Sequence, residues 1–123
     1  MSNTMSWIFG PQLVGLIFLI VGSIQRYFPP KHINQYYGYR MPSAQKSQAA
    51  WDEANRYSAI YMMKCAFIVI VAGLVISLTL NSWSASANIK FGLIIFLMIL
   101  SAILPAVLMI IATEKHMAKT FDH

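Results

Sequence analysis

The sequence predicts an all-α integral membrane protein with three transmembrane helices in a single membrane domain, residues 1–123. Of the 123 residues, 58% are hydrophobic and 11% are charged, whereas soluble domains carry about 25% charged residues. The apolar residues form three long runs, and five of the nine Lys and Arg residues lie in the polar stretch between the first two runs. A soluble fold could not hide this much apolar surface, so the composition argues against a soluble domain.

The three apolar runs give transmembrane spans at about residues 7–26, 59–80 and 89–112. Each run is close to the length of about 20 apolar residues that a helix needs to cross the hydrocarbon core. Pro29 and Pro30 follow the first run and end its helix, because proline has no amide hydrogen to donate. No Lys or Arg precedes the first run, which favours a retained helix over a cleaved signal peptide.

The linker, residues 27–58, is predicted to form a cytoplasmic loop and then a cytoplasmic or interfacial helix that leads into the second span. Ser43 is expected to cap this helix by accepting a hydrogen bond from a backbone amide two or three residues later. Asp52 and Arg56 have the i, i+4 spacing of a supporting ion pair. Lys64 lies early in the second span, where its ammonium is expected to extend to the lipid headgroups.

The distribution of basic residues predicts an outside N-terminus and a cytoplasmic C-terminus, because basic segments are retained on the cytoplasmic side. The polar stretch between the first two runs carries Arg26, Lys31, Arg40, Lys46 and Arg56. The cytoplasmic tail, residues 113–123, adds Lys115 and Lys119, whereas no basic residue precedes the first span. Aromatic side chains near span ends are typical of the membrane interface. Here they are Trp7, Tyr27, Tyr57, Tyr61 and Trp83.

The polar side chains that could bind a ligand or a partner are concentrated in residues 34–58. At helical spacing, four of these side chains share one stripe and predict a surface for a partner. They are Ser47, Trp51, Asn55 and Ser58. Gly38, between two tyrosines, is expected to supply a turn conformation that a Cβ would penalise. The candidate ligand- or partner-binding residues are Asn34, Tyr37, Gly38, Tyr39, Arg40, Pro42, Ser47, Trp51, Asn55 and Arg56.

Arg40 is the leading functional residue of this set. It lies two residues before Pro42, where a fixed backbone could aim the guanidinium at a carboxylate, a carbonyl or a lipid phosphate. The alternative is a structural clamp, in which the Arg40 side chain holds the loop against the helix ends. The sequence leaves both interpretations open.

The same segment resembles the signature of the SdpI-like family of bacterial membrane proteins, which is named for an immunity protein against a secreted peptide toxin. The elements that carry the resemblance are Asn34-x-x-Tyr37-Gly-Tyr-Arg40-x-Pro42, Lys46-Ser47, Trp51 and Ala54-Asn55-Arg56-Tyr57. The resemblance implies a multi-pass protein of the bacterial cytoplasmic (inner) membrane, with immunity to a membrane-active peptide through a cytoplasmic-side site. The chain departs from the family pattern at Met41, where Thr is usual, and at Ser58-Ala59, where Gly is usual.

A second class of function is a non-catalytic accessory or scaffold subunit of a larger membrane protein complex. Small residues let helices approach closely in a membrane. Two pairs of them, Gly15 with Gly22 and Ala102 with Ala106, could pack against such a partner. The same pairs could instead pack the spans against one another within the chain.

The residues do not favour an enzyme, a cofactor or a metal site. Asp52 and Glu53 are adjacent, so they point about 100° apart on a helix and cannot act together on one substrate. His32, His116 and His123 lack metal-ligand spacing with Cys or carboxylates. The net charge of +5 is concentrated in the linker and the tail. Membrane lipids, rather than nucleic acid, are therefore the expected partners, with a peptide toxin or a larger membrane complex as further candidates.

Overall fold

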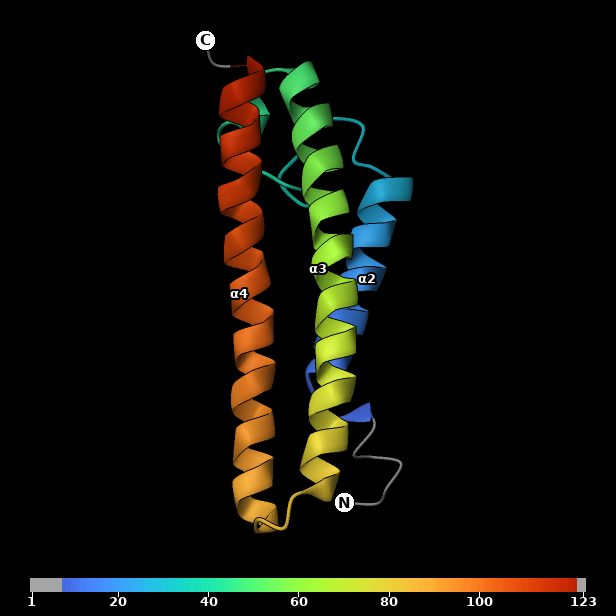
Figure 1. Cartoon of the computed structure of the whole chain (residues 1–123). Coiled ribbons are helices and arrows are strands. Elements are labelled where there is room, and N and C mark those ends of the chain that lie inside the picture. Colours follow the sequence, from blue (N-terminus) through green and yellow to red (C-terminus); the bar gives the residue numbers. More distant parts are fainter. Residues whose placement is uncertain (1–7, 122–123) are drawn as a thin grey trace.

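The computed structural model describes residues 8–121, which form helices and, within that range, no strand. The elements are α2 (Pro11–Tyr27), the 3-10 turn η1 (Ala44–Lys46), α3 (Gln48–Ser82) and α4 (Ala87–Phe121). Figure 1 shows α3 and α4 as a long antiparallel pair joined by a short connection, with α2 alongside α3. Two residues used in the sequence analysis, Trp7 and His123, lie outside the described residues.

The polar helix predicted from Ser43 and the second span are one continuous helix, α3, of 35 residues that begins at Gln48. The prediction that Ser43 caps this helix is wrong, because Ser43 makes no side-chain capping hydrogen bond and only the short turn η1 follows it. Ser47 is the cap instead: its backbone is extended and its side chain accepts a hydrogen bond of 3.0 Å from the amide of Ala50.

The tail predicted after the third span is also helical. α4 runs for 35 residues, passes through Pro105 and ends at Phe121. At 1.5 Å per residue, α3 and α4 are each roughly 50 Å long, which exceeds the hydrocarbon thickness of about 30 Å. Each helix is therefore longer than a crossing of the hydrocarbon core requires.

α2 packs closely along α3 because glycines leave room between the two backbones. A Cβ on Gly15 would lie 3.0 Å from the Ala66 carbonyl oxygen, and a Cβ on Gly22 would lie 3.3 Å from the Ala59 carbonyl oxygen. At the N-terminal end of α2, the Gln12 side chain lies against Gly73 of α3. Gly15 and Gly22 thus pack two helices of the same chain, which is how small residues act in membrane helices.

Buried side-chain hydrogen bonds fasten α2 to α3 at both ends. The Gln12 amide donates to the Ser77 hydroxyl over 3.0 Å. The Gln25 amide donates to the Ser58 hydroxyl over 2.9 Å and to the Asn55 carbonyl over 3.0 Å. Between these two glutamines the contact is formed by small and apolar groups, so the polar pairs fix the register of α2 on α3.

The outer faces of the helices are apolar, as expected of a membrane protein. α3 and α4 are both long and apolar enough to cross a membrane. Only 22% of the most apolar stretch of α3 and 6% of that of α4 is buried, unlike the core helix of a soluble protein. On α3, Ile68 and Val71 are 69% and 61% exposed. α2 has 17 described residues, and the number of crossings and the orientation of the chain stay predictions.

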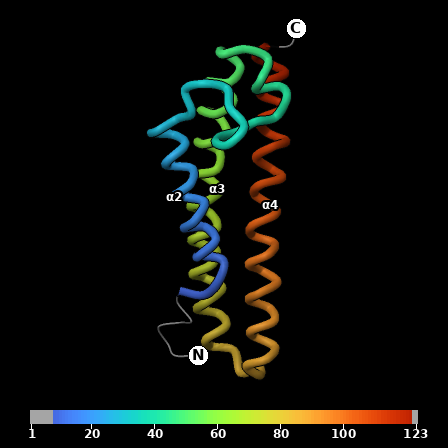
Figure 2. Tube along the Cα trace, turned by 180° about the vertical axis from the view of Figure 1, so that it is seen from behind, coloured from blue at the N-terminus to red at the C-terminus, as the bar shows by residue number. Residues whose placement is uncertain are grey.

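The loop between α2 and α3 folds back over the ends of the long helices. Figure 2 shows this segment crossing α3 toward α4, at the end of the molecule where the C-terminus lies. Its side chains and those of the two helices form the buried apolar core of this end. The core consists of Tyr39, Ala44, Ala50, Trp51, Ala54 and Met117, with Met41, Met109 and Ile110 packed against it.

Candidate functional site

Asn55 holds the loop to α3. Its side chain is 1% exposed, and its Oδ1 accepts a hydrogen bond of 2.6 Å from the amide of Tyr39. Its Nδ2 donates to the Tyr39 carbonyl over 3.3 Å and to the Trp51 carbonyl over 2.9 Å. One side-chain amide thereby satisfies both backbone groups of Tyr39, which would otherwise be buried without partners.

Gly38 makes this contact possible. It has a φ of +97°, a left-handed conformation that side chains penalise. A Cβ at this position would collide with Oδ1 of Asn55 and would lie 2.6 Å from Cγ of Pro30. The predicted turn at Gly38 is therefore confirmed, and its reason is the approach of Asn55 to the backbone.

Two further motif residues shape the loop. The Trp51 side chain is fully buried, and its indole nitrogen donates to the Pro30 carbonyl over 2.7 Å. Oδ1 of Asn34 accepts hydrogen bonds of 2.8 Å from two successive amides, those of Tyr36 and Tyr37. A side-chain amide used in this way stabilises a turn.

Tyr37 connects the loop to the end of α2. Its hydroxyl lies 2.5 Å from the Phe28 carbonyl oxygen and 3.2 Å from the Ile24 carbonyl oxygen. The Ile24 carbonyl also accepts a hydrogen bond from the Phe28 amide, whereas the Phe28 carbonyl lies just beyond the end of α2, where backbone carbonyls lack a partner in the helix, and this hydroxyl supplies one. Three members of the predicted stripe, Trp51, Asn55 and Ser58, form a buried face, and their partners within the chain are this loop and Gln25. The fourth member, Ser47, is exposed.

Glu114 of α4 anchors the loop from the other side. Its Oε2 accepts hydrogen bonds from the Tyr39 hydroxyl over 2.8 Å and from the Ser43 hydroxyl over 2.6 Å. Burial, together with the hydrogen bond and the charge of Glu114, raises the pKa of Tyr39 well above its usual value. Tyr39 therefore stays protonated and keeps donating to Glu114 at physiological pH.

Glu53 joins α3 to α4 outside the loop. Its carboxylate accepts two hydrogen bonds from Arg56, of 2.8 and 2.7 Å, and lies 2.5 Å from Nε2 of His116. The His116 ring stacks on Tyr57 with centroids 4.1 Å apart. The predicted Asp52–Arg56 ion pair is wrong, because Arg56 pairs with Glu53 one residue nearer on the helix.

The hydrogen bonds from Arg56 hold the pKa of Glu53 at about 2, well below its usual value. Partial burial opposes this lowering, and the hydrogen bond from His116 adds to it. Asp52 instead accepts a hydrogen bond of 2.8 Å from the Gln48 side chain. Glu53 is therefore ionised at physiological pH and holds the polar ends of the two long helices together.

A groove of about 770 Å³ lies between the loop and the three helices. Val21 and Gln25 of α2 line it, together with Met62 of α3 and Met109 and Ile110 of α4. The loop contributes five of the ten sequence-predicted site residues. They are Asn34, Tyr37, Gly38, Tyr39 and Arg40. The groove thus combines an apolar wall from the helices with a polar rim from the loop.

Arg40 lies in this groove with an exposed side chain. Within residues 8–121 its guanidinium has no hydrogen-bond or ion-pair partner, and only its carbonyl is used, by the Gln45 side chain over 2.5 Å. The clamp interpretation of the Arg40 side chain has no contact to support it. A free guanidinium beside an apolar wall is suited to bind a carboxylate, a carbonyl or a phosphate.

The remaining predicted site residues do not line the groove. The Pro42 carbonyl accepts a hydrogen bond from the Gln45 amide, and Ser47 caps α3. Trp51 and Asn55 are buried beneath the loop, and Arg56 pairs with Glu53.

Sequence reasoning missed three polar contributors to this end of the molecule. Gln25 reaches from α2 to α3, whereas Glu114 and His116 reach from α4 to the loop and to α3. A glutamine at the end of an apolar run and a lone glutamate after the third span were visible signals. Their partners lie 30 or more residues away in sequence, and spacing rules for one helix cannot find such pairs. In the part of the chain that the structure describes, no group of three potential metal ligands occurs.

The low pKa of Glu53 predicts how stability depends on pH. A carboxylate with a lowered pKa contributes stability above its unfolded pKa, about 4.5, and loses it as the pH falls toward 2. We expect the detergent-solubilised chain to have a higher thermal midpoint than its Glu53→Gln variant at pH 6, with a gap that narrows between pH 4.5 and 2. When both chains also carry Arg56→Gln, the difference in thermal midpoint caused by Glu53→Gln should be smaller at every pH in this range. A gap that stays constant with pH would contradict this role for Glu53.

Comparison with known proteins confirms the resemblance seen in the loop and in the start of α3. The sequence model of the SdpI/YfhL protein family matches residues 31–113. The chain is 40% identical over 62 residues to a Bacillus subtilis (strain 168) protein named "Uncharacterized protein YfhL". That match covers 50% of this chain and 56% of the relative, so the chain spans about half the relative's length. No solved structure gives a significant match. The match over most of its length shows that the chain belongs to the SdpI/YfhL protein family.

Proposed function

We propose that this protein is a non-catalytic immunity factor of the bacterial cytoplasmic membrane, which binds a membrane-active peptide in the groove beneath its loop. In this proposal the chain crosses the membrane three times, with its N-terminus outside and the loop, the groove and its C-terminus on the cytoplasmic side. The main support for this proposal is that the groove has both apolar and polar lining residues, which suits an occupant with one apolar and one polar face.

The wall of the groove is apolar and adaptable. Three of the eight methionines, Met41, Met62 and Met109, line it together with Val21 and Ile110. Methionine side chains are flexible and polarizable, and proteins use them on surfaces that accept varied apolar partners. The groove volume of about 770 Å³ is in the range of small-ligand sites. It therefore accepts a few side chains of a peptide rather than a whole folded partner.

The rim of the groove is polar and positively charged. Arg40 has no carboxylate partner among the described residues, and Gln35 and Gln45 line the same opening. A guanidinium and side-chain amides are suited to the carbonyls and the terminal carboxylate of a peptide. An amphipathic peptide lying in the membrane interface could place its apolar side chains in the wall and its polar groups at Arg40.

An accessory or scaffold subunit is the alternative function. Gly15 and Gly22 are occupied by packing within the chain, whereas Gly92 on α4 has open space around it. Gly92 is the observation that favours this alternative, because a second membrane helix could approach α4 there. Extraction in mild detergent followed by mass measurement separates the two functions. A stoichiometric complex with a larger membrane protein would support the scaffold function, and a free chain would count against it.

The proposed orientation can be tested by cysteine labelling in a Cys65→Ser background. Tyr36 at the loop tip is 91% exposed, and Ser84 is exposed in the connection at the opposite end of α3. We expect a membrane-impermeant maleimide to label Ser84→Cys in intact spheroplasts and to label Tyr36→Cys only after permeabilisation. Labelling of Tyr36→Cys in intact spheroplasts would contradict the proposed orientation.

The immunity role predicts that cells without the protein become sensitive to membrane-active peptides. The probes are a set of synthetic amphipathic peptides, each made with a free C-terminal carboxylate. We expect cells that lack the protein to be inhibited by a lower concentration of at least one of these peptides. Expression of the wild-type protein in these cells should restore resistance, and expression of Arg40→Ala should not. Loss of a charge-assisted hydrogen bond should weaken binding by about ten-fold or more.

Lys119→Ala is the matched control, because Lys119 is an exposed cation on α4 that does not line the groove. This variant should restore resistance fully while being expressed at the same level as Arg40→Ala. Normal resistance in both the deletion strain and the Arg40→Ala strain would refute the proposal.

A further inference from the structure

A second cavity lies at the end of α2 and is lined by a different set of residues. Its volume is about 290 Å³, and it has only Gln25 in common with the groove. Three basic residues line it: Arg26 at the end of α2, Lys31 in the loop and Arg56 on α3. Asp52 is the one acidic residue in its lining, so three positive charges face one negative charge.

The charges of this cavity are only partly compensated. Within residues 8–121, neither Arg26 nor Lys31 has a carboxylate within ion-pair distance. The Arg26 guanidinium lies 5.9 Å from the centre of the Tyr27 ring, a cation–π contact that leaves its charge uncancelled. Arg56 is paired with Glu53, which leaves Arg26 and Lys31 as the cations available to an external anion.

The backbone around the cavity is held in place. The lining includes Pro29 and Pro30, whose rings restrict the backbone. The Pro30 carbonyl accepts the hydrogen bond from the buried indole of Trp51. The Lys31 carbonyl accepts a hydrogen bond of 2.6 Å from the Gln48 side chain. The loop that carries Lys31 is therefore fixed against the start of α3, next to the end of α2.

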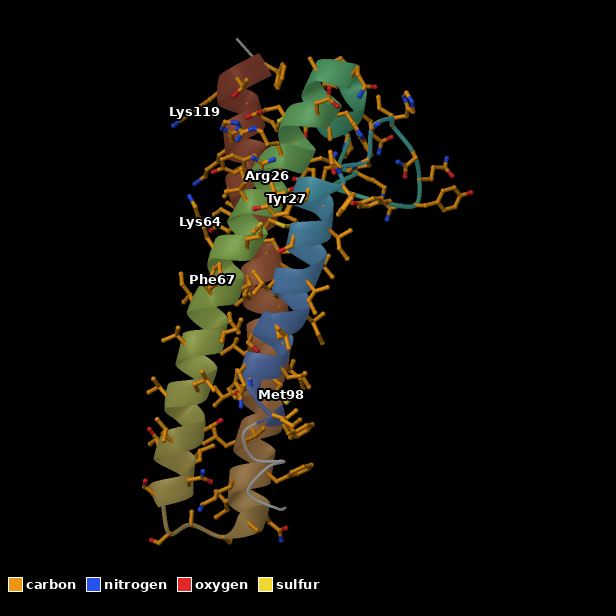
Figure 3. All side chains as sticks on the ribbon, turned by 90° about the vertical axis from the view of Figure 1, so that its right-hand side faces the viewer. Arg26, Tyr27, Lys64, Phe67, Met98 and Lys119 are labelled. Carbon is orange, nitrogen blue, oxygen red and sulfur yellow. The ribbon has the colours of Figure 1, made fainter. Side chains whose placement is uncertain are left out.

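The cavity lies where the apolar surface of the helices gives way to the polar end. In Figure 3, Arg26 and Tyr27 lie at the same end of the molecule as Lys119, with Lys64 and then Phe67 further along toward the apolar part. Phe67 is 58% exposed, and on α2 the exposed apolar side chains run up to Ile24, which is 48% exposed. Tyrosines and basic residues at such a boundary mark the depth of the lipid headgroups.

We propose that this cavity binds the phosphate of an anionic phospholipid, with Arg26 and Lys31 as its ligands. The phosphodiester oxygens accept hydrogen bonds from the guanidinium and the ammonium, while the acyl chains lie beside the exposed Phe67, which is on the same face of α3 as Arg56 of the cavity lining. A basic pocket between membrane helices is suited to such a headgroup. The site goes beyond the proposed peptide groove and does not depend on what occupies it.

The test is native mass spectrometry of the purified full chain, mixed with equal amounts of phosphatidylglycerol and phosphatidylcholine. We expect the chain to retain phosphatidylglycerol preferentially. The double variant Arg26→Gln, Lys31→Gln should retain phosphatidylglycerol about ten-fold less, because each basic residue that is removed takes away part of the attraction for the anionic headgroup. The charge-preserving variant Arg26→Lys, Lys31→Arg should keep the preference, which separates a loss of charge from a loss of fold.

The matched control is Lys115→Gln, Lys119→Gln, which removes the same charge from exposed positions of α4 outside the cavity. This control should keep the lipid preference. Equal retention by the wild type and the Arg26→Gln, Lys31→Gln variant would overturn the proposal, as would an equal loss in the control. Inorganic phosphate at the same concentration should not displace the lipid, and displacement would show a site for free phosphate instead.

Discussion

The pairing of one buried side-chain amide with the backbone of Tyr39 is the interaction on which the polar end of this protein depends. The loop must cross the ends of three helices, and its backbone groups need partners wherever they are shielded from water. Asn55 supplies both a donor and an acceptor to the same residue. This approach requires Gly38 to have no side chain, and it directs the Tyr39 hydroxyl to Glu114 on the neighbouring helix.

The two ends of the long helices differ in the contacts that they make. Toward the connection between α3 and α4, the helices expose large apolar side chains and hold α2 through glycines and buried amides. At the other end, Glu53 and Glu114 carry the contacts between α3, α4 and the loop. Both proposed binding sites lie where these two regions meet. The apolar part offers a surface for acyl chains or peptide side chains, and the polar part offers the free cations.

Several features of this structure could be predicted from the sequence, because they are local. Apolar runs of sufficient length predicted the two helices that can cross a membrane. The sequence Tyr37-Gly38-Tyr39 predicted a turn, and helical spacing placed Trp51 and Asn55 on one face. The family resemblance rested on the same residues, and the family match confirms it.

Other features could not be predicted, because they depend on contacts between distant segments. Ser43 looked like a helix cap, but its hydroxyl is used by Glu114, 71 residues further along the chain. Arg56 had two acidic neighbours, and only the position of His116 beside Glu53 shows which of them belongs to the network between α3 and α4. The groove likewise needs side chains from three helices and the loop, so no single segment could have indicated it.

Hydrogen exchange at the Tyr39 amide tests the central role of Asn55 most directly. Asn55→Ala leaves this buried amide without its acceptor, at a cost of about 1–3 kcal/mol. We expect amides of residues 37–41 to exchange about ten-fold faster or more in this variant. Amides in the apolar middle of α3 should keep their protection, and Asp52→Ala should leave exchange at residues 37–41 unchanged. Equal protection of residues 37–41 in the wild type and in Asn55→Ala would contradict the central role of Asn55.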